Sequence, residues 1–235
     1  MNETLVITAF LDANVLYPAF LRDVLLRLAS QNAFQARRSA QVLDEWMAAL
    51  TRDRPDIPLA RMQRTLQLMA MHFQNARVDG YEHLIETITL PDADDRHVLA
   101  AAMHCGARVI VTMNLRDFPD EALADFEIEA VHPDVFILGL LGTHQRAVVT
   151  ALQRLRNSLR KPSQDAVDLL ASMKRQGLAQ SADALGYLST TCNAHRRRQH
   201  VSSRGAVPEL VGLESRLQAA CFNTTERRFF LFVTS

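Results

Sequence analysis

Two short apolar runs constrain the fold of this chain more than any other feature. "LVITAFL" (5–11) is rich in β-branched and aromatic residues, and "RVIVT" (108–112) is apolar almost throughout. Runs of this length without polar alternation are typical of strands buried on both faces of a parallel sheet. Burial on both faces requires helices on both sides, so the two runs predict an α/β fold.

The segments around these runs alternate between helical and strand-like patterns. Apolar residues recur at helical spacing in four segments: 19–30, 40–53, 58–76 and 94–105. Three weaker runs favour strands: "AFQAR" (33–37), "ARVDG" (76–80) and "FEIEAVHP" (126–133). Strands that alternate with helices predict a mostly parallel central sheet.

Local signals indicate where some helices begin and end. Ser39 is a predicted N-cap for the helix that follows it. Asp92 or Asp94 is predicted to begin the helix that runs to Cys105, and Gly106 to stop it.

The character of the sequence changes after Pro133, where two or three helices follow without a strand between them. From Thr190 onward the helical periodicity fails. We therefore predict three parts: a first domain at 1–140, a helical extension at 141–189, and an irregular or disordered tail at 190–235.

Bulk composition narrows the functional classes. Lys plus Arg and Asp plus Glu both number 26, so no global basic field predicts nucleic-acid binding, which would need a local patch. The three cysteines form no CxxC pair, which argues against a zinc site and favours a reduced cytosolic setting. The N-terminus lacks a basic stretch before its apolar run, and no apolar run reaches about 18 residues. We predict a cytoplasmic protein with no membrane partner.

Four carboxylates follow the predicted strands or begin the next helices: Asp12, Glu45, Asp95 and Asp117. Ligands of open parallel sheets bind at the carboxyl ends of the strands, so we expect these residues to converge. At about 5 Å and an effective dielectric near 20, each pair costs roughly 3 kcal/mol, so such a cluster persists only if protons or cations neutralise it. Oxygen ligands favour Mg²⁺ or Mn²⁺, and such ions support phosphodiester hydrolysis.

The ordered set of motifs around these residues resembles the PIN domain, in the bacterial group similar to VapC-type toxins. The resemblance covers about residues 5–140 and rests on "LDANVLYP", "SAQVLDEW", "DADDRHVLAAAMHCGARVIVTMNLRDFP" and "IEAVHPDVF". It implies a PIN-like three-layer sandwich followed by C-terminal helices. It further implies a Mg²⁺- or Mn²⁺-dependent endoribonuclease, the toxin of a type II toxin–antitoxin module, with an RNA substrate, a cognate antitoxin protein and a homodimer.

The same resemblance carries residue roles onto this sequence. It implies that Asp12, Glu45, Asp95 and Asp117 are the catalytic and metal-binding residues. It implies polar support from three further residues: Asn14, Thr112 and Asn114. In an extended segment Thr112 and Asn114 point the same way, which fits a shared supporting role.

Other interpretations of single residues stay open. Asp44 adjoins Glu45, and either acid could flank the buried stripe of that helix, although the family pattern favours Glu45. Asp117 could merely stabilise a turn. His97 lies two positions after Asp95, off its helical face, so we interpret it as a surface or packing histidine and not as a general base.

Two alternative functions for the whole chain stay open at this point. A phosphoryl-transferring hydrolase of the haloacid-dehalogenase type also places an aspartate after its first strand. That class needs a second aspartate where this chain has Asn14, and a lysine in mid-chain, whereas the only lysines are Lys161 and Lys174. The second alternative is a PIN fold that binds RNA or protein without cutting.

Overall fold

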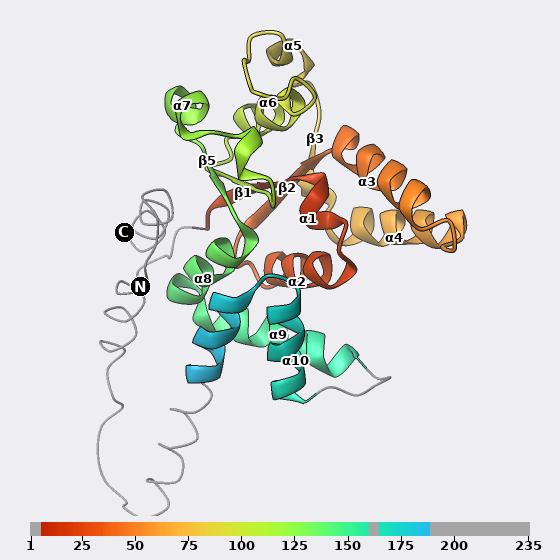
Figure 1. Cartoon of the computed structure of the whole chain (residues 1–235), viewed down its shortest axis with the longest axis vertical. Coiled ribbons are helices and arrows are strands. Elements are labelled where there is room, and N and C mark those ends of the chain that lie inside the picture. Colours follow the sequence, from red (N-terminus) through yellow and green to blue (C-terminus); the bar gives the residue numbers. More distant parts are fainter. Residues whose placement is uncertain (1–5, 160–164, 189–235) are drawn as a thin grey trace, which may run out of the picture.

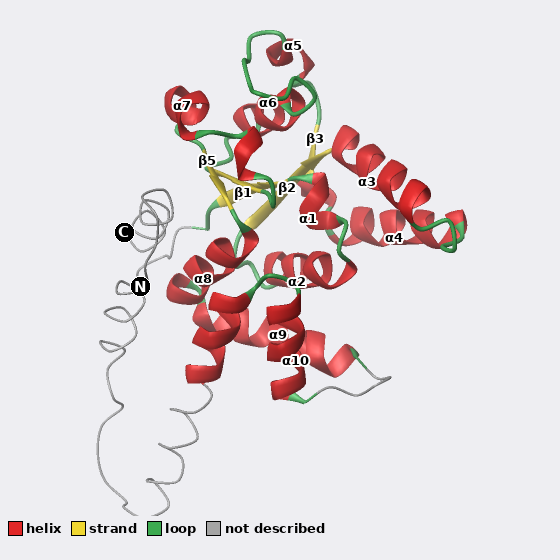
Figure 2. Cartoon of the chain, viewed as in Figure 1, coloured by secondary structure: helices red, strands yellow, loops and turns green. Residues whose placement is uncertain are grey.

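Five strands form one parallel sheet in the computed structural model, which describes residues 6–159 and 165–188 (Figures 1 and 2). The strand order is β3-β2-β1-β4-β5, and each pair of neighbouring strands is parallel. The strands are β1 (Thr8–Leu11), β2 (Gln35–Ser39), β3 (Arg77–Val78), β4 (Val109–Val111) and β5 (Glu129–Val131). The predicted α/β fold with a parallel sheet is confirmed. The predicted tail lies outside the described residues.

Helices cover both faces of this sheet. The α-helices are α1 (Ala13–Leu16), α2 (Ala19–Ser30), α3 (Ala40–Asp53), α4 (Leu59–His72), α5 (Glu82–Ile85), α6 (Arg96–His104), α7 (Asp120–Leu123), α8 (Pro133–Thr143), α9 (Gln145–Ser158) and α10 (Ala166–Arg175). Short 3-10 turns are η1 (Gln74–Ala76), η2 (Leu115–Asp117) and η3 (Ala124–Phe126), and 179–188 is helical. In Figure 1, α5 and α6 lie on one side of the sheet and α2, α8 and α9 on the other.

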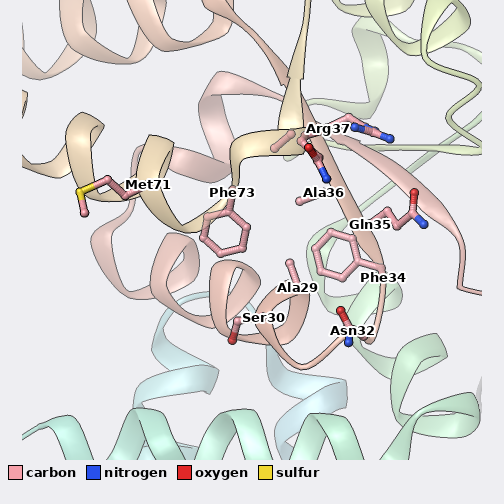
Figure 3. Close-up of a pocket in the computed structure, with 11 residues that line it drawn as sticks. Ala29, Ser30, Asn32, Phe34, Gln35, Ala36, Arg37, Met71 and Phe73 are labelled. Atoms are coloured by element: carbon pink, nitrogen blue, oxygen red, sulfur yellow. Dashed lines mark hydrogen bonds between the residues drawn. The ribbon is translucent and has the colours of Figure 1, made fainter.

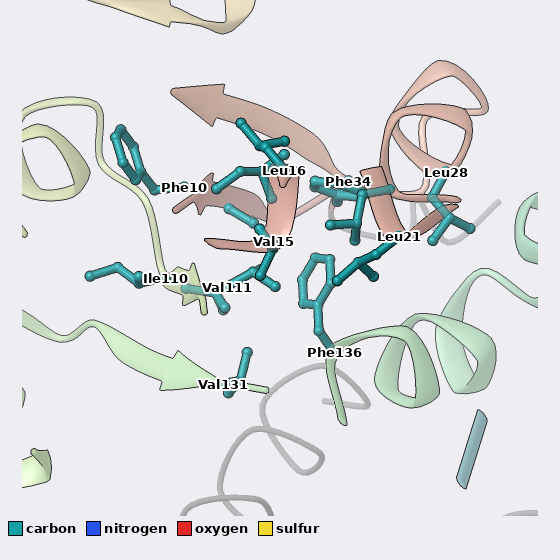
Figure 4. Packing of buried hydrophobic residues seen from close by; sticks show 14 of the residues in the cluster. Phe10, Val15, Leu16, Leu21, Leu28, Phe34, Ile110, Val111, Val131 and Phe136 are labelled. Carbon is teal, nitrogen blue, oxygen red and sulfur yellow. The ribbon is translucent and has the colours of Figure 1, made fainter. Parts of the chain in front are cut away.

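The core follows from the register of the central strands. Phe10 pairs with Ile110 in one row, and Leu11 pairs with Val111 in the next, so successive rows point to opposite faces. All four side chains are buried. Figure 4 shows the cluster of buried residues on which the sheet rests, where Phe34 meets Phe136 edge to face with ring centroids 4.9 Å apart.

The predicted helix signals were confirmed at two positions and wrong at two. The Ser39 hydroxyl accepts a hydrogen bond from Val42 N at 3.2 Å, as an N-cap should. Gly106 has φ +65 after α6, a conformation that glycine adopts without strain. Asp92 and Asp94, however, do not cap α6. The N-cap position of α6 belongs to Asp95. The Asp92 carboxylate instead accepts a hydrogen bond from Asp94 N at 2.9 Å, within the turn before the helix.

Strand β2 begins two residues later than predicted. Ala33 and Phe34 are buried, but they lie before the first residue of the strand. The strand pairing continues at the other end as far as Ser39. The strand therefore ends where α3 starts. This brings the first turns of α3 to the carboxyl edge of the sheet.

The C-terminal helices pack directly on the sheet domain. Helix α8 is buried over most of its length, and α9 packs against α2. The buried Asp134 carboxylate accepts from the backbone N–H groups of Gln180 and Ser181 at 2.9 and 2.8 Å, which ties the helical stretch 179–188 to α8. The boundary placed at residue 140 falls inside α8. No helix in the described part of the chain is long and apolar enough to cross a membrane.

Candidate active site

Asp12 stands at the carboxyl end of β1 and is held there by three donors. Its backbone N–H continues the sheet by donating to Val111 O at 3.2 Å. As the N-cap of α1, its Oδ1 accepts from Ala13 N at 2.6 Å. Its Oδ2 accepts from Asn14 Nδ2 at 2.6 Å and from the Thr112 hydroxyl at 2.7 Å. The Asp12 carboxylate is therefore fixed in one orientation.

Thr112 joins this network across the sheet, from the end of β4. Its hydroxyl donates to Asp12 and accepts from Asn14 Nδ2 at 2.9 Å and Asn114 N at 3.0 Å. One donor and two acceptors are all that a hydroxyl offers, so the group is saturated. Asn14 Oδ1 accepts from Met113 N at 2.9 Å, which fastens the loop after β4 to helix α1.

Burial dominates the electrostatics of Asp12, whose exposed fraction is 5%. Desolvation raises the pKa of its carboxyl, and the hydrogen bonds from Thr112 and Ala13 oppose that shift. The charge of Glu45 raises the Asp12 pKa further, and that of His97 lowers it. Both groups from the neighbouring helices are therefore near Asp12.

Asp95 and Asp117 form the more exposed part of the site. Asp95 is half-buried at the start of α6, and Asp117 is half-buried in the turn η2. Burial, the Asp12 charge and a hydrogen bond to Asp117 raise the pKa of Asp95 to about 7. Asn114 Nδ2 donates to Asp117 from the other side. The two carboxyls thus lie within hydrogen-bonding reach of each other.

Glu45 faces this group from α3, whereas its neighbour Asp44 is exposed. The Glu45 side chain is 41% exposed, and its Oε1 lies 2.7 Å from His97 Nε2. His97 is only 3% exposed, so the expectation of a surface histidine was wrong and that of a packing histidine was right. Its contact with Glu45 was not anticipated, because the two residues belong to different helices.

The structure thus brings the four predicted carboxylates to one edge of the sheet, with Asn14, Thr112 and Asn114 bonded among them. Within residues 6–159 and 165–188, no Lys or Arg forms a salt bridge with any of the four. In the same part of the chain, no three His, Cys, Asp or Glu side chains are grouped as a ready metal site. The oxygen donors, with no Lys or Arg partner among the described residues, nevertheless fit a hard divalent cation.

A cavity of about 690 Å³ lies elsewhere, along the first half of β2 (Figure 3). Phe34 and Phe73 flank it, and Met71, Asn32 and Arg37 contribute to its lining. None of the four carboxylates lines it. Figure 3 shows a mixed lining without an acidic side chain, so this hollow lacks the groups that metal-assisted chemistry needs.

Comparisons with known proteins agree with this geometry. Residues 8–116 match the family described as PIN domain, and residues 133–186 match the family described as VapC50 C-terminal domain. A protein of Mycobacterium tuberculosis named "Putative ribonuclease VapC50" is 48% identical over 68 residues, which cover 29% of this chain and 40% of that protein. The aligned part of the chain therefore spans less than half of that relative. No solved structure matches.

The two family matches follow one another along the chain, separated by residues 117–132, which include β5; the second match begins with α8, after the last strand. Together they take in more than half of the 235 residues, including Asp12, Glu45 and Asp95. Residues 8–116 therefore form a region that matches the PIN-domain family, and it is followed at 133–186 by a region that matches the C-terminal domain of VapC50.

Proposed function

We propose that this protein is a Mg²⁺- or Mn²⁺-dependent endoribonuclease that hydrolyses RNA phosphodiester bonds. The observation that carries the proposal is the group of carboxylates at the carboxyl edge of the sheet, none of which forms a salt bridge with a Lys or Arg in the described part of the chain. Asp12 stands at its centre, with Asp95 and Asp117 on one side and Glu45 on the other. The name of the mycobacterial relative supports the same activity.

The four carboxylates are the proposed metal ligands. A bound divalent ion would lower the pKa of a coordinated water and offset charge on the scissile phosphate. Asp12 is suited to a fixed ligand because its hydrogen bonds leave one Oδ1 lone pair free. Asp95 and Asp117 are suited to bind the same ion, since their carboxyls already lie close to each other.

The supporting polar residues have distinct proposed tasks. Thr112 and Asn14 hold Asp12 through their donors, and Asn114 holds Asp117. Because these residues are bonded before any ligand arrives, little reorganisation is left for the moment of binding. The partial exposure of Asp95 and Asp117 leaves this side of the site open to a polyanionic substrate.

The biological setting is part of the same proposal. The name VapC given to the relative favours a toxin of a type II toxin–antitoxin module, with an antitoxin protein as partner. A homodimer and a cytoplasmic location stay predictions of the resemblance. A catalytically silent RNA- or protein-binding PIN fold is the alternative, but none of the four acids is missing, and no observation favours it.

The test is cleavage of a mixed pool of structured RNAs by the purified full chain in Mg²⁺, in Mn²⁺ and in chelator. An Asp12→Asn/Asp95→Asn double variant serves as the inactive form. An Asp44→Asn/Asp94→Asn double variant is the matched control, because both residues are exposed neighbours of site residues. We expect metal-dependent cleavage by the parent and the control and none by the first variant. Cleavage that survives in the first variant, or its absence from a folded parent in every metal, would refute the activity.

A further inference from the structure

His97 is a polar side chain on an otherwise apolar stretch of helix. The buried positions of α6 that follow it are Val98, Leu99, Ala100, Ala101 and Ala102. The His97 ring is itself only 3% exposed. Burying a polar ring is unfavourable unless a partner compensates for the water it loses. The contacts of this ring therefore indicate why a histidine occupies the position.

The ring makes a single polar contact among the described residues. Its Nε2 lies 2.7 Å from Glu45 Oε1, and its buried Nδ1 has no hydrogen-bond partner. A ring that served packing alone would gain from being apolar here. The compensation for its burial is concentrated in the bond to Glu45.

Glu45 has the complementary need. Its side chain is 41% exposed, and in the described part of the chain its one ion pair or hydrogen bond is the contact with His97. Without that contact, a half-exposed glutamate on α3 would be free to change rotamer and turn into solvent. Asp12 is held by three donors, whereas Glu45 depends on one.

We propose that His97 is a positioning residue that holds Glu45 toward the cation site proposed above, an inference that rests on the proposed function. Helix α6 then contributes to the site in two ways, because its N-cap residue is Asp95 and it carries His97 two residues later. In this arrangement α6 presents one ligand itself and orients a second one that belongs to α3. The role needs an N–H donor at the place of Nε2 and does not need one at Nδ1.

The variants follow from that requirement. His97→Phe keeps an aromatic ring among apolar neighbours but loses the donor. His97→Gln places an amide N–H close to the position of Nε2. His97→Asn places one close to that of Nδ1, too short to reach Glu45. Gln should therefore rescue and Asn should not, although both are polar amides.

The measurement is Mn²⁺ binding to the full chain by titration calorimetry, which does not depend on catalysis. We expect roughly tenfold weaker binding for His97→Phe and His97→Asn, in the range typical of groups that orient metal ligands, and near-parent binding for His97→Gln. Thermal unfolding in chelator checks that each variant is folded. Combined with Glu45→Gln, His97→Phe should cause no further loss, because its effect passes through Glu45.

Three outcomes would overturn the proposal. If Glu45→Gln weakens Mn²⁺ binding but His97→Phe binds as the parent does, His97 does not position Glu45, and the proposed metal site still stands. The same conclusion holds if the losses of Glu45→Gln and His97→Phe add in the double variant. If the parent itself binds no Mn²⁺, the metal site fails, and the role of His97 fails with it.

Discussion

The carboxylates at the carboxyl edge of the sheet include two parts that are built differently: Asp12, called here the fixed half, and the pair Asp95 and Asp117, called the adjustable half. Asp12 is almost fully buried, and all its bonds come from donors: a backbone N–H, an amide and a hydroxyl. Asp95 and Asp117 are half-buried and bond to each other. The first half is complete as it stands, whereas the second puts two acids in contact. The difference indicates a fixed anchor for a cation and a side that adjusts when the cation binds.

The largest expected effect is the loss of RNA cleavage when Asp12, in the fixed half, is replaced. Asp12→Asn should lower RNA cleavage by more than about a hundredfold, because changing residues outside the metal ligands already costs roughly 10–100-fold. Asp117→Asn, on the adjustable half, should cost less. Initial rates of cleavage at saturating Mn²⁺ measure both. Equal losses for the two variants would remove the distinction between the halves.

The next largest effect is the thermal stabilisation by Mn²⁺, which should depend on Asp95 and Asp117 in the adjustable half. Mn²⁺ at about one hundred times its Kd should raise the midpoint of thermal unfolding by about 5–10 °C, since ligand binding to the folded state stabilises it. The Asp95→Asn/Asp117→Asn variant should lose most of that shift, and Asp94→Asn, at an exposed neighbour, should keep it. Differential scanning fluorimetry distinguishes these cases. An unchanged shift in the double variant would place the ion elsewhere.

A smaller effect is expected from the support of Asp12. Thr112→Val removes the hydroxyl that Asp12, Asn14 and the Asn114 N–H share, so it should lower the free energy of unfolding by about 1–3 kcal/mol. Thr112→Ser keeps the hydroxyl and should stay close to the parent. Urea denaturation in chelator measures both. If valine were as stable as serine, the network would not be what fixes Asp12.

The last effect is on the pH dependence of stability without metal. The folded pKa of Asp95 is about 7, above its ordinary value of 3.8, so the folded state retains a proton that the unfolded state releases between these values. The free energy of unfolding should therefore fall as pH rises from about 4 to about 7 in chelator, and level off above. Asp95→Asn should flatten this slope. The midpoints of urea denaturation across the pH range measure this dependence. Identical pH slopes for the parent and Asp95→Asn would contradict the raised pKa of Asp95.

Much of the fold and the positions of the carboxylates could be predicted from local sequence. Asp12 follows a run of apolar residues that only a buried strand explains, and Ser39 and Gly106 satisfy short-range capping rules. These features depend on neighbours within a few residues, so the sequence alone reveals them. The start of β2 was missed because Phe34 is apolar for its packing against Phe136, which is far away in the chain.

The interactions that escaped prediction join separate elements. His97 was judged by its spacing from Asp95 within one helix, whereas its partner Glu45 comes from another. Asp134 likewise caps a helical stretch more than forty residues later. Asp92 and Asp94 satisfied the rule for helix caps, but the chain uses Asp95 in that position, where its side chain is left for the site. Such choices depend on tertiary contacts that no local pattern contains.

The most direct test of the carboxylate edge is anomalous diffraction at the manganese absorption edge, from crystals of the full chain grown in Mn²⁺. The account predicts an anomalous peak about 2.1 Å from carboxylate oxygens of Asp12 and Asp95, with Asp117 turned toward the same ion. A well-ordered site without such a peak, or a peak on other residues with Asp95 and Asp117 still in contact, would contradict it.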